Sequence, residues 1–588
     1  MKKILFCLIT TIAAANFNAQ ISLTATAGTT TGTYTTLKGA FDAINAGTHQ
    51  GAITINVTAS TAETASAVLN GSGGVVSYTS VLIKPGTGVN ATISSADTVA
   101  TLKLNGADNV TIDGSNNGTS TRNLTITNTY SAAGTPVVAW VASTTTDGAQ
   151  NVTFKNTNII GATSSGTVVG IIVSGSALGA AAEVSNNNFV STNNLFNKAQ
   201  NAIFAIGNAT VTDTGFMIKN NVIGSSVVAD KMGFRGLAVQ NAKNFEISGN
   251  VITGVSTSST STSAGILVGA AATNGLVFNN KISDVSNTNT SGYGAAGLYF
   301  NCSSAVANMI AYNNTISGVV GYGYAAGGGV ADNGNGIVIG AGAGYKIYYN
   351  TVVMDANQTV AGRPSALNVI STVTAAGAID LRNNIFVNKQ TQAGDRYAIY
   401  SGAANTVFST INYNDYFSTG AALGYIGSAR PALSDLQAGF GGNVNSVSVS
   451  PSFASATDFH LATSGNAALD NKGTPVAEVT LDADGMARNA TTPDLGGYEF
   501  TNLVLAVNDV AAKNKLNYYP NPVVDFITIN NDSKIRNVEV YNMSGQRLIN
   551  ETVNAEKGSV DMRKVPTGVY ILKVNSEKDS QSLKIIKK

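Results

Sequence analysis

Apolar and polar residues alternate over short stretches from about residue 52 onward, with Gly, Asn and Ser between the stretches. A period of two predicts short β-strands, and the residues between them predict tight turns. In Asn244–Gly254 a short strand, a Gly-Asn bend and a second short strand follow one another. The same phrase returns at Phe216–Ile223, Leu276–Ile282, Met309–Ile316, Tyr345–Val352 and Ile379–Phe386.

An asparagine at the bend sets the period of this repeat. Successive positions are 29 to 36 residues apart, and a third strand precedes the pair in most units, as at Ile266–Val268 and Leu298–Phe300. Three strands per unit, with no helix between them, predict a parallel β-helix whose turns differ in length. The series is Asn188, Asn221, Asn250, Asn280, Asn314, Asn350, Asn384 and Asn414.

Asparagine suits such a bend for two reasons. It adopts left-handed backbone angles more readily than other non-glycine residues. Amides stacked from coil to coil, about 4.8 Å apart, can also form a hydrogen-bonded ladder. Propeller blades and leucine-rich repeats have different periods, and immunoglobulin-like sandwiches repeat at about 100 residues. We therefore predict an all-β rod of about a dozen coils.

One segment near the N-terminus has a different period. In Thr36–Gly47 the apolar residues Leu37, Ala40, Phe41 and Ile44 fall on one face of a helix, and Gly47 is a C-terminal stop. An uncovered terminal coil would leave backbone groups free to pair with another chain. We therefore predict that this helix caps the open end of the rod.

The first 19 residues have the features of a secretory signal. Lys2 and Lys3 precede the apolar run Ile4–Ala15, and cleavage is expected after Ala19. The run is shorter than the roughly 20 residues of a membrane-spanning helix, so no transmembrane segment is predicted. Loss of the signal would leave Cys302 as a single cysteine, for which we predict a buried, unreactive thiol rather than a disulfide.

Charge is distributed unevenly along the chain. Residues 20–512 carry 19 Lys/Arg and 25 Asp/Glu, a net of −6, whereas residues 513–588 carry 13 and 8, a net of +5. We predict a signal at 1–19, a β-helix at 20–504, a linker at 505–512 and a separate domain at 513–588. The formal charge of the whole chain is +1, which gives no electrostatic case for nucleic acid or an anionic membrane.

Phrases near both ends of the predicted rod resemble those of secreted right-handed β-helix proteins of the pectin-lyase-like superfamily. The resemblance implies that residues 451–500 close the rod. It identifies architecture rather than activity, because the superfamily includes lyases and glycoside hydrolases. The phrases are Thr36–Gly47, Asn105–Gly114, Asp458–Leu461, Ala468–Asp470, Asp482–Arg488 and Pro493–Phe500.

The C-terminal segment 513–588 closely resembles the type A C-terminal sorting domain of the type IX secretion system. It contains Tyr518–Val523 with its Tyr-Pro-Asn-Pro core, Gly545–Leu548, Val565–Tyr570 and the terminal Lys584–Lys588. The resemblance implies a small β-sandwich of about seven short strands, export by the type IX machinery, and a secreted or cell-surface destination. Val565 stands where the family usually has Leu.

A hydrolase of this fold needs carboxylates that converge on one face, and a lyase needs clustered Asp with an Arg or Lys base. Acidic residues are sparse in the repeat, and no two adjacent units place them at matching strand positions. We interpret Asp380 with Arg382, and Asp395 with Arg396, as surface pairs. The acidic residues of the repeat are Asp230, Glu246, Asp284, Asp332, Asp355, Asp380, Asp395 and Asp415.

The remaining candidates for chemistry are weak. His49 and His460 lack metal-ligand spacing and are interpreted as structural or surface residues. Asp482-Ala483-Asp484-Gly485 suggests calcium, but Pro493 occupies the twelfth position, so pairing of Arg488 with Asp482, Asp484 or Asp494 is favoured. We interpret Asp113–Gly118 as a turn in preference to an ion site. Two interpretations stay open for a group of tyrosines: they form an aromatic patch that binds sugar, or they pack within the strands. These residues are Tyr293, Tyr322, Tyr324, Tyr345, Tyr348 and Tyr349.

These observations leave two functions open. The first is an adhesin-like or glycan-binding rod without catalysis, with a polysaccharide as its possible ligand and no required cofactor. The second is a polysaccharide lyase or glycoside hydrolase with its site on the flank of the β-helix. The scarcity of charged residues, 11% of the chain, favours the first.

Overall fold

The computed structural model describes residues 19–326, 329–501 and 516–588. They form two compact units, one ending at residue 503 and the other beginning at residue 504. The predicted signal at 1–19 and linker at 505–512 lie outside the described residues, apart from Ala19. In the described part of the chain, the helices are too short or too polar to cross a bilayer.

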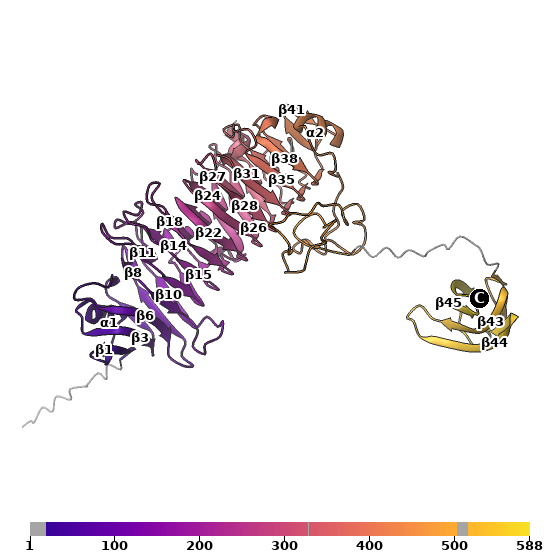
Figure 1. Cartoon of the computed structure of the whole chain (residues 1–588), viewed down its shortest axis with the longest axis horizontal. Coiled ribbons are helices and arrows are strands. Elements are labelled where there is room, and N and C mark those ends of the chain that lie inside the picture. Colours follow the sequence, from indigo (N-terminus) through magenta and orange to yellow (C-terminus); the bar gives the residue numbers. More distant parts are fainter. Residues whose placement is uncertain (1–18, 327–328, 502–515) are drawn as a thin grey trace, which may run out of the picture. The chain divides into compact units, whose positions relative to one another are not determined.

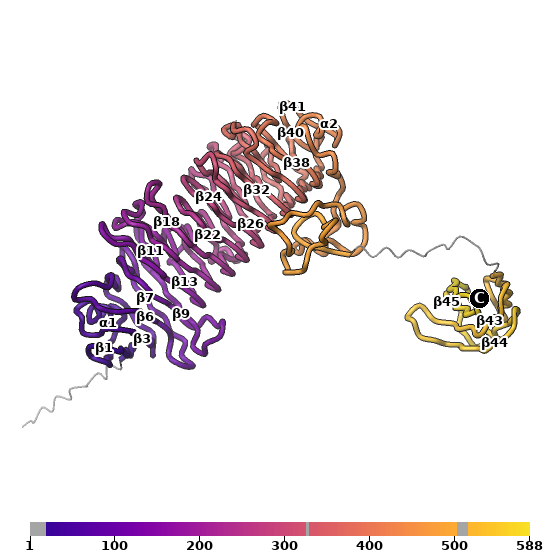
Figure 2. The backbone as a smooth tube through the Cα atoms, viewed as in Figure 1, coloured from indigo at the N-terminus to yellow at the C-terminus, as the bar shows by residue number. Residues whose placement is uncertain are grey.

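The first unit is a parallel β-helix in which the chain passes repeatedly through three sheets, here called A, B and C (Figures 1 and 2). Sheet A consists of β2 (Thr31–Tyr34), β1 (Ile21–Gly28), β3 (His49–Val57), β6 (Tyr78–Pro85), β9 (Val110–Asp113), β12 (Thr153–Lys155), β15 (Val190–Thr192), β18 (Asp213–Thr214), β19 (Met217–Lys219), β22 (Ala242–Ser248), β25 (Thr273–Phe278), β28 (Met309–Tyr312), β32 (Tyr345–Tyr348), β35 (Ile379–Arg382) and β38 (Phe408–Asn412).

Sheet B consists of β4 (Thr61–Glu63), β7 (Ala91–Ser95), β10 (Leu124–Asn128), β13 (Thr157–Ile160), β16 (Leu195–Asn197), β20 (Val222–Ile223), β23 (Val251–Thr257), β26 (Lys281–Asn287), β29 (Thr315–Ser317), β30 (Val319–Gly321), β33 (Thr351–Met354), β36 (Ile385–Asn388) and β39 (Asp415–Ser418). Sheet C consists of β5 (Ala67–Asn70), β8 (Ala100–Asn105), β11 (Val137–Ala142), β14 (Val169–Ser174), β17 (Asn201–Ile206), β21 (Arg235–Gln240), β24 (Ser263–Ala270), β27 (Ala295–Cys302), β31 (Gly334–Ala341), β34 (Ser365–Val369), β37 (Tyr397–Ser401), β40 (Gly424–Ile426) and β41 (Ser428–Arg430).

The interior of the rod is one continuous apolar core. Alternation along each strand directs one set of side chains inward, and parallel register stacks them from coil to coil, as with Ile218, Ile247 and Val277. Aromatic rings stack in the same way: the centroids of Phe189 and Phe216 lie 5.8 Å apart. The predicted parallel β-helix is therefore confirmed.

The predicted asparagine ladder is present at the corner between sheets A and B. From Asn221 to Asn384 each buried side-chain amide donates to the side-chain oxygen of the next asparagine at 2.9–3.0 Å, and Asn414 is the last acceptor. Asn188 was wrongly placed in this series: its position is held by Asn194, whose backbone N–H donates to Asn221 Oδ1. Asn188 belongs to a second, exposed ladder, where it donates to Asn151.

The explanation of the ladder from backbone angles was also wrong. The left-handed residue at this corner is the one before the ladder asparagine, such as Asn313 with φ 55° or Tyr349 with φ 53°. The ladder residue itself supplies hydrogen bonds to its neighbours.

Both ends of the rod are covered. The predicted cap is α1 (Leu37–Asn45), which Thr36 caps at its N-terminus and which packs on β5 and β4. At the opposite end, β41 pairs antiparallel with β40, and α2 (Leu433–Phe440) packs beside them (Figure 1). Sequence reasoning missed α2. Within the described residues, four short 3₁₀ helices lie in loops: η1 (Val228–Asp230), η2 (Gly323–Ala326), η3 (Val330–Asp332) and η4 (Asn405–Val407).

We call residues 442–500 the return segment. Their course differs from our expectation that residues 451–500 close the rod. They fold back along its flank instead of crossing its end. Gly497 N–H donates to Thr351 Oγ1 at 3.0 Å, and the Asn313 amide donates to the Leu481 carbonyl at 3.0 Å. The return segment thus contacts coils that precede it by well over a hundred residues.

The second unit is an antiparallel β-domain with its own apolar core. The described residues contain five strands rather than about seven, because β43 and β44 are long and interrupted by bulges instead of being broken into short pieces. The strands are β42 (Asn517–Tyr519), β43 (Phe526–Tyr541), β44 (Arg547–Asp561), β45 (Gly568–Ser576) and β46 (Ser580–Lys587).

Candidate functional site

A shallow groove of about 410 Å³ runs over the outer face of sheet A, and we call it the sheet A groove. Met217, Glu246, Leu276 and Ile310 occupy one register position on the successive strands β19, β22, β25 and β28, so their side chains form a row along the rod. Met217 is 42% exposed and Leu276 is 37% exposed. The apolar side chains of this row, which Glu246 interrupts, form the floor of the groove along the rod axis.

The second asparagine ladder forms one edge of this groove. The Asn274 amide donates to Asn244 Oδ1 at 3.1 Å, and the Asn308 amide donates to Asn274 Oδ1 at 2.9 Å. All three residues are exposed and have positive φ. Each amide therefore retains hydrogen-bonding capacity toward solvent, and the edge presents donors and acceptors at the spacing of the coils.

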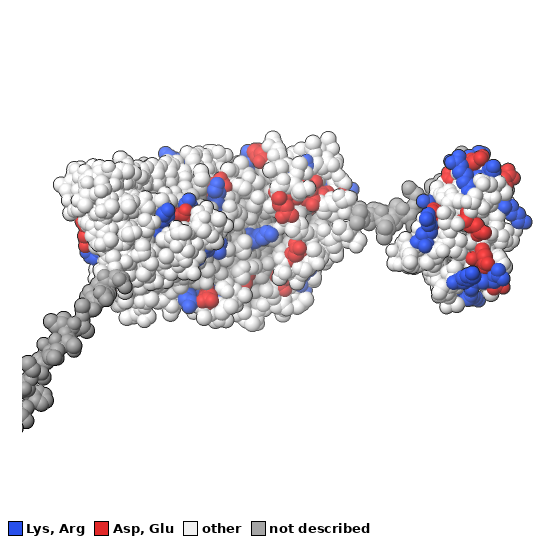
Figure 3. Space-filling view, turned by 90° about the horizontal axis from the view of Figure 1, so that it is seen from below, with Lys and Arg blue, Asp and Glu red and all other residues white. Residues whose placement is uncertain are grey.

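The groove carries little net charge. Glu246 is the one carboxylate among its described lining residues, and its Oε1 lies 3.8 Å from Nζ of Lys219. The face of the rod seen in Figure 3 is largely uncharged. An uncharged surface with an apolar floor and amide edges suits a polar, uncharged or weakly charged ligand better than nucleic acid.

The return segment adjoins the groove farther along sheet A. Ile310 and Tyr312 pack against a buried cluster of Tyr348, Val476 and Val479. A smaller hollow of about 180 Å³ lies between Phe278 and Tyr312 on one side and residues 478–485 on the other. The rings of Phe278 and Tyr312 stack face to face at 4.7 Å, so each covers one face of the other.

The predicted tyrosine patch is not assembled. Tyr345, Tyr348 and Tyr349 are at most 1% exposed, because the core encloses the first and the return segment covers the other two. Tyr324 lies with its ring 6.0 Å from the guanidinium of Arg363. The aromatic cluster that does form on sheet C was missed by sequence reasoning: Tyr400 and Tyr425 stack at 4.6 Å beside Tyr397.

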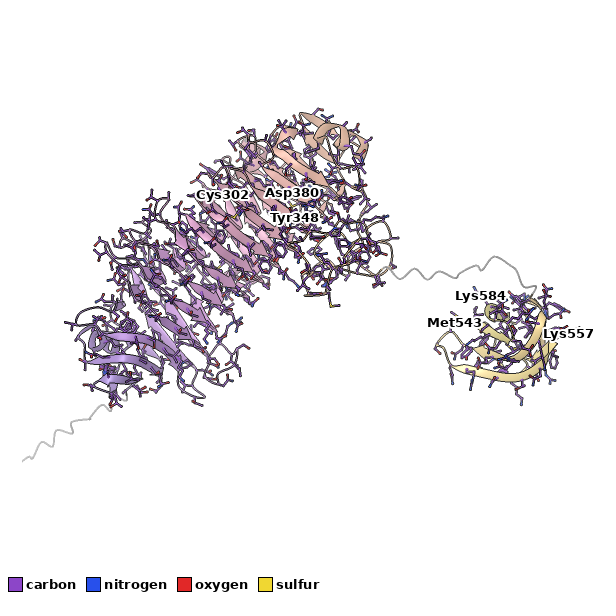
Figure 4. All side chains as sticks on the ribbon, in the orientation of Figure 1. Cys302, Tyr348, Asp380, Met543, Lys557 and Lys584 are labelled. Atoms are coloured by element: carbon purple, nitrogen blue, oxygen red, sulfur yellow. The ribbon has the colours of Figure 1, made fainter. Side chains whose placement is uncertain are left out.

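The predicted ion pair Asp380–Arg382 is present at 2.7 Å. Asp380 and Tyr348 lie close together on the rod (Figure 4). Tyr348 extends the ion pair by donating its hydroxyl to Asp380 Oδ2 at 2.7 Å, and burial raises the pKa of that phenol. The second predicted pair is wrong: Asp395 lies 3.4 Å from Arg363, and Arg396 instead donates to Thr419 Oγ1 at 2.8 Å. Neither acid faces a second carboxylate in the described interactions.

Arg488 fastens the return segment to the rod, but not through the predicted aspartates. It donates to Glu499 Oε1 at 3.0 Å and to Asn313 Oδ1 at 2.8 Å, with its guanidinium 3.8 Å from the ring centre of Tyr349. Asp482 uses both carboxylate oxygens to accept backbone N–H groups, including that of Glu499 at 2.9 Å. That carboxylate therefore organises a turn.

His460 lies at the centre of a cluster of residues whose types can act in catalysis. Among the described residues of the return segment, this is the one such cluster beside a hollow. Nδ1 of His460 contacts Asp458, its Nε2 lies 2.7 Å from Asp484 Oδ2, and its ring centre lies 3.8 Å from that of Tyr498. Burial opposes the charged imidazole, but the two carboxylates outweigh it and raise the pKa of His460 above 6.5. Asp458, Tyr498 and Lys281 line an adjacent hollow of about 200 Å³.

The other predicted residues have structural positions. His49 is buried, and its Nε2 lies 2.6 Å from the hydroxyl of Tyr34. Cys302 is buried, as predicted, and burial raises the pKa of its thiol to about 11. Asp113 accepts the Ser115 N–H at 3.0 Å within its turn and lies 3.1 Å from Lys155.

Comparison with known proteins identifies the C-terminal unit. Residues 517–588 match the model of the secretion system C-terminal sorting domain. The tail is a type IX sorting domain. It indicates export by the type IX machinery to the cell surface or the medium.

No activity of the β-helix follows from its similarity to known proteins. No curated protein matches the chain. Among solved structures, a double mutant of the periplasmic alginate epimerase AlgG is similar, with 11% identity and a TM-score of 0.27 over 76% of this chain and 98% of that one. A similarity at this level says nothing of activity.

Proposed function

We propose that the exported rod binds polysaccharide along the sheet A groove without cleaving it. The observation that carries this proposal is the row of Met217, Leu276 and Ile310 beside the exposed amides of Asn244, Asn274 and Asn308. Sugar rings offer apolar C–H faces and polar hydroxyl edges, which match an apolar floor and amide edges. A repeating polymer also matches a groove whose features recur with each coil.

The scarcity of reactive groups in the groove supports binding without cleavage. Glycosidic hydrolysis uses two carboxyl groups on opposite sides of the bond. The described lining offers Glu246 alone, and Lys219 accompanies it.

A direct binding experiment tests the proposal. We expect Leu276→Glu to weaken polysaccharide binding about fivefold or more, because losing part of one apolar contact costs about 1 kcal/mol. Val228→Glu is the matched control, since Val228 is 81% exposed and lies outside the groove. Equal affinity of both variants and the parent protein would place the ligand elsewhere.

The second candidate function is a polysaccharide lyase or hydrolase at His460. The observation that favours it is the imidazole held between two carboxylates beside a hollow lined by Lys281 and Tyr498. An imidazole with a raised pKa can serve as a general acid. Depolymerisation by the parent protein that His460→Gln abolishes would establish this function.

A further inference from the structure

A cavity of about 500 Å³ lies at the corner between sheets B and C, on a different part of the rod from the sheet A groove. We call it the Arg235 pocket. Loops of four successive coils form its walls, and they contribute Ser165, Gln200, Arg235 and Ser259 among others. Its described lining contains hydroxyl and amide groups and one cation, but no carboxylate.

Arg235 lies at the start of β21 and is partly buried. Its guanidinium sits 4.0 Å from the ring centre of Phe234, which covers one face of the cation. Nε is buried and lacks a hydrogen-bond partner within the described residues. Burial lowers the pKa of Arg235 to about 10, so the side chain remains a cation at neutral pH.

Two other enclosed arginines of the rod differ from Arg235 because their guanidinium groups donate to side-chain or main-chain oxygens, although Nε of Arg488 also lacks a partner within the described residues. Arg122 donates to both oxygens of Asn193, and Arg488 reaches Glu499 and Asn313. No ion pair of Arg235 occurs in the part of the chain that the structure describes. A partly buried guanidinium without an anion loses part of its hydration without gaining a compensating charge, and an oxyanion in the pocket would supply that charge.

Asn201 pairs with Arg235 in register on the preceding coil, and its buried Oδ1 has no hydrogen-bond partner within the described residues. Hydroxyl and amide side chains of the neighbouring loops, including Ser164, Ser165 and Gln200, line the pocket with Arg235. The pocket therefore offers a cation together with hydroxyl and amide groups, which fits a ligand that carries both an oxyanion and hydroxyl groups.

We propose that the Arg235 pocket binds the carboxylate or sulfate of an acidic sugar. The guanidinium can hold such an oxyanion through a bidentate contact, while the serine, threonine and glutamine side chains of the wall receive the sugar hydroxyls. This site goes beyond the proposed function, since it lies on another corner and does not depend on the sheet A groove.

Calorimetric titration of the purified protein at constant ionic strength tests the site. The probes are glucuronate, glucose 6-sulfate and glucose. We expect at least one acidic sugar to bind, and glucose to bind about tenfold more weakly or worse, because charge-assisted hydrogen bonds are lost. The two acidic probes distinguish a carboxylate ligand from a sulfate ligand. Absence of binding by both would overturn the proposal.

Variants assign the binding to Arg235. Arg235→Gln should weaken binding of the acidic sugar about tenfold or more, whereas Arg396→Gln, on a partly exposed arginine of another coil, should leave the affinity unchanged. Ser259→Asp places a carboxylate in the pocket and should also abolish binding, which keeps the test open if Arg235→Gln folds poorly. Unchanged affinity in Arg235→Gln or in Ser259→Asp would contradict the assignment. If polysaccharide does not bind to the sheet A groove, the results expected for the Arg235 pocket still hold, because the two sites are separate.

Discussion

Asn350 donates both its backbone N–H and its side-chain amide to Oδ1 of Asn384, at 2.9 and 3.0 Å. One oxygen on the following coil thus accepts two hydrogen bonds, and the remaining amide hydrogen of Asn350 reaches main-chain carbonyls. Both side chains are fully buried. The ladder therefore satisfies polar groups at a corner that water cannot reach, and it locks each coil to the next.

Removal of one ladder residue should destabilise the rod. Asn350→Ala leaves buried donors and acceptors unpaired on both neighbouring coils, and we expect a loss of about 2 kcal/mol or more in denaturant unfolding. Asn274→Gly, in the exposed ladder, keeps a residue that tolerates the left-handed backbone and should cost about 1 kcal/mol or less, because water replaces the lost partner. Equal losses in the two variants would contradict the role given to burial.

Arg488 should hold the return segment against the flank. Its guanidinium is buried between Glu499, Asn313 and Tyr349, so Arg488→Ala leaves a partly buried carboxylate without its cation and removes the contact with Tyr349, at a cost of about 2 kcal/mol. We expect limited proteolysis to cut first within residues 442–500 in this variant. Arg396→Ala serves as the control. Protection equal to that of the parent protein would mean that other contacts hold the segment.

The His460 cluster should make stability depend on pH. Its folded-state pKa is raised above 6.5, so its contribution is complete below about pH 6.5 and is lost as the pH rises through the folded-state pKa. We expect the melting temperature of the parent protein to fall over that interval more than that of His460→Gln. Parallel pH profiles of the two proteins would contradict the raised pKa. The side chain is 36% exposed, so the difference should be small.

Deletion of residues 513–588 should retain the protein in the periplasm. The tail is a sorting domain with its own core, so the β-helix should fold without it while losing its export signal. Fractionation with protease shaving of intact cells measures the outcome, and circular dichroism of the truncated protein checks the fold. Normal surface display of the truncated protein would contradict the expectation.

The sequence predicted those features that repeat or that a short pattern determines. The period of the asparagines from Asn221 to Asn414 and the apolar face of Thr36–Gly47 both depend on neighbouring residues in one coil or one helix. Asn188 was misassigned because it also lies at a coil corner, and spacing alone cannot tell two corners of one coil apart. The donors and acceptors identify the right one, Asn194.

The remaining differences depend on contacts distant in sequence. Arg488 meets Glu499 and Asn313 because the return segment reverses along the flank, and no local pattern records that reversal. The return segment also covers Tyr348 and Tyr349, so these two side chains are buried. Arg235 was not predicted as a site, because its isolation follows from which loops of four coils adjoin it.

Product analysis of the purified protein with polysaccharides tests the central claim most directly. Pectin, alginate and glycosaminoglycans would each be incubated with the protein, and chain length, reducing ends and unsaturated products would be measured alongside binding. We predict binding of at least one polymer with unchanged chain length, and weaker binding by Leu276→Glu than by Val228→Glu. Shortened chains that persist in Leu276→Glu and disappear in His460→Gln would contradict the account.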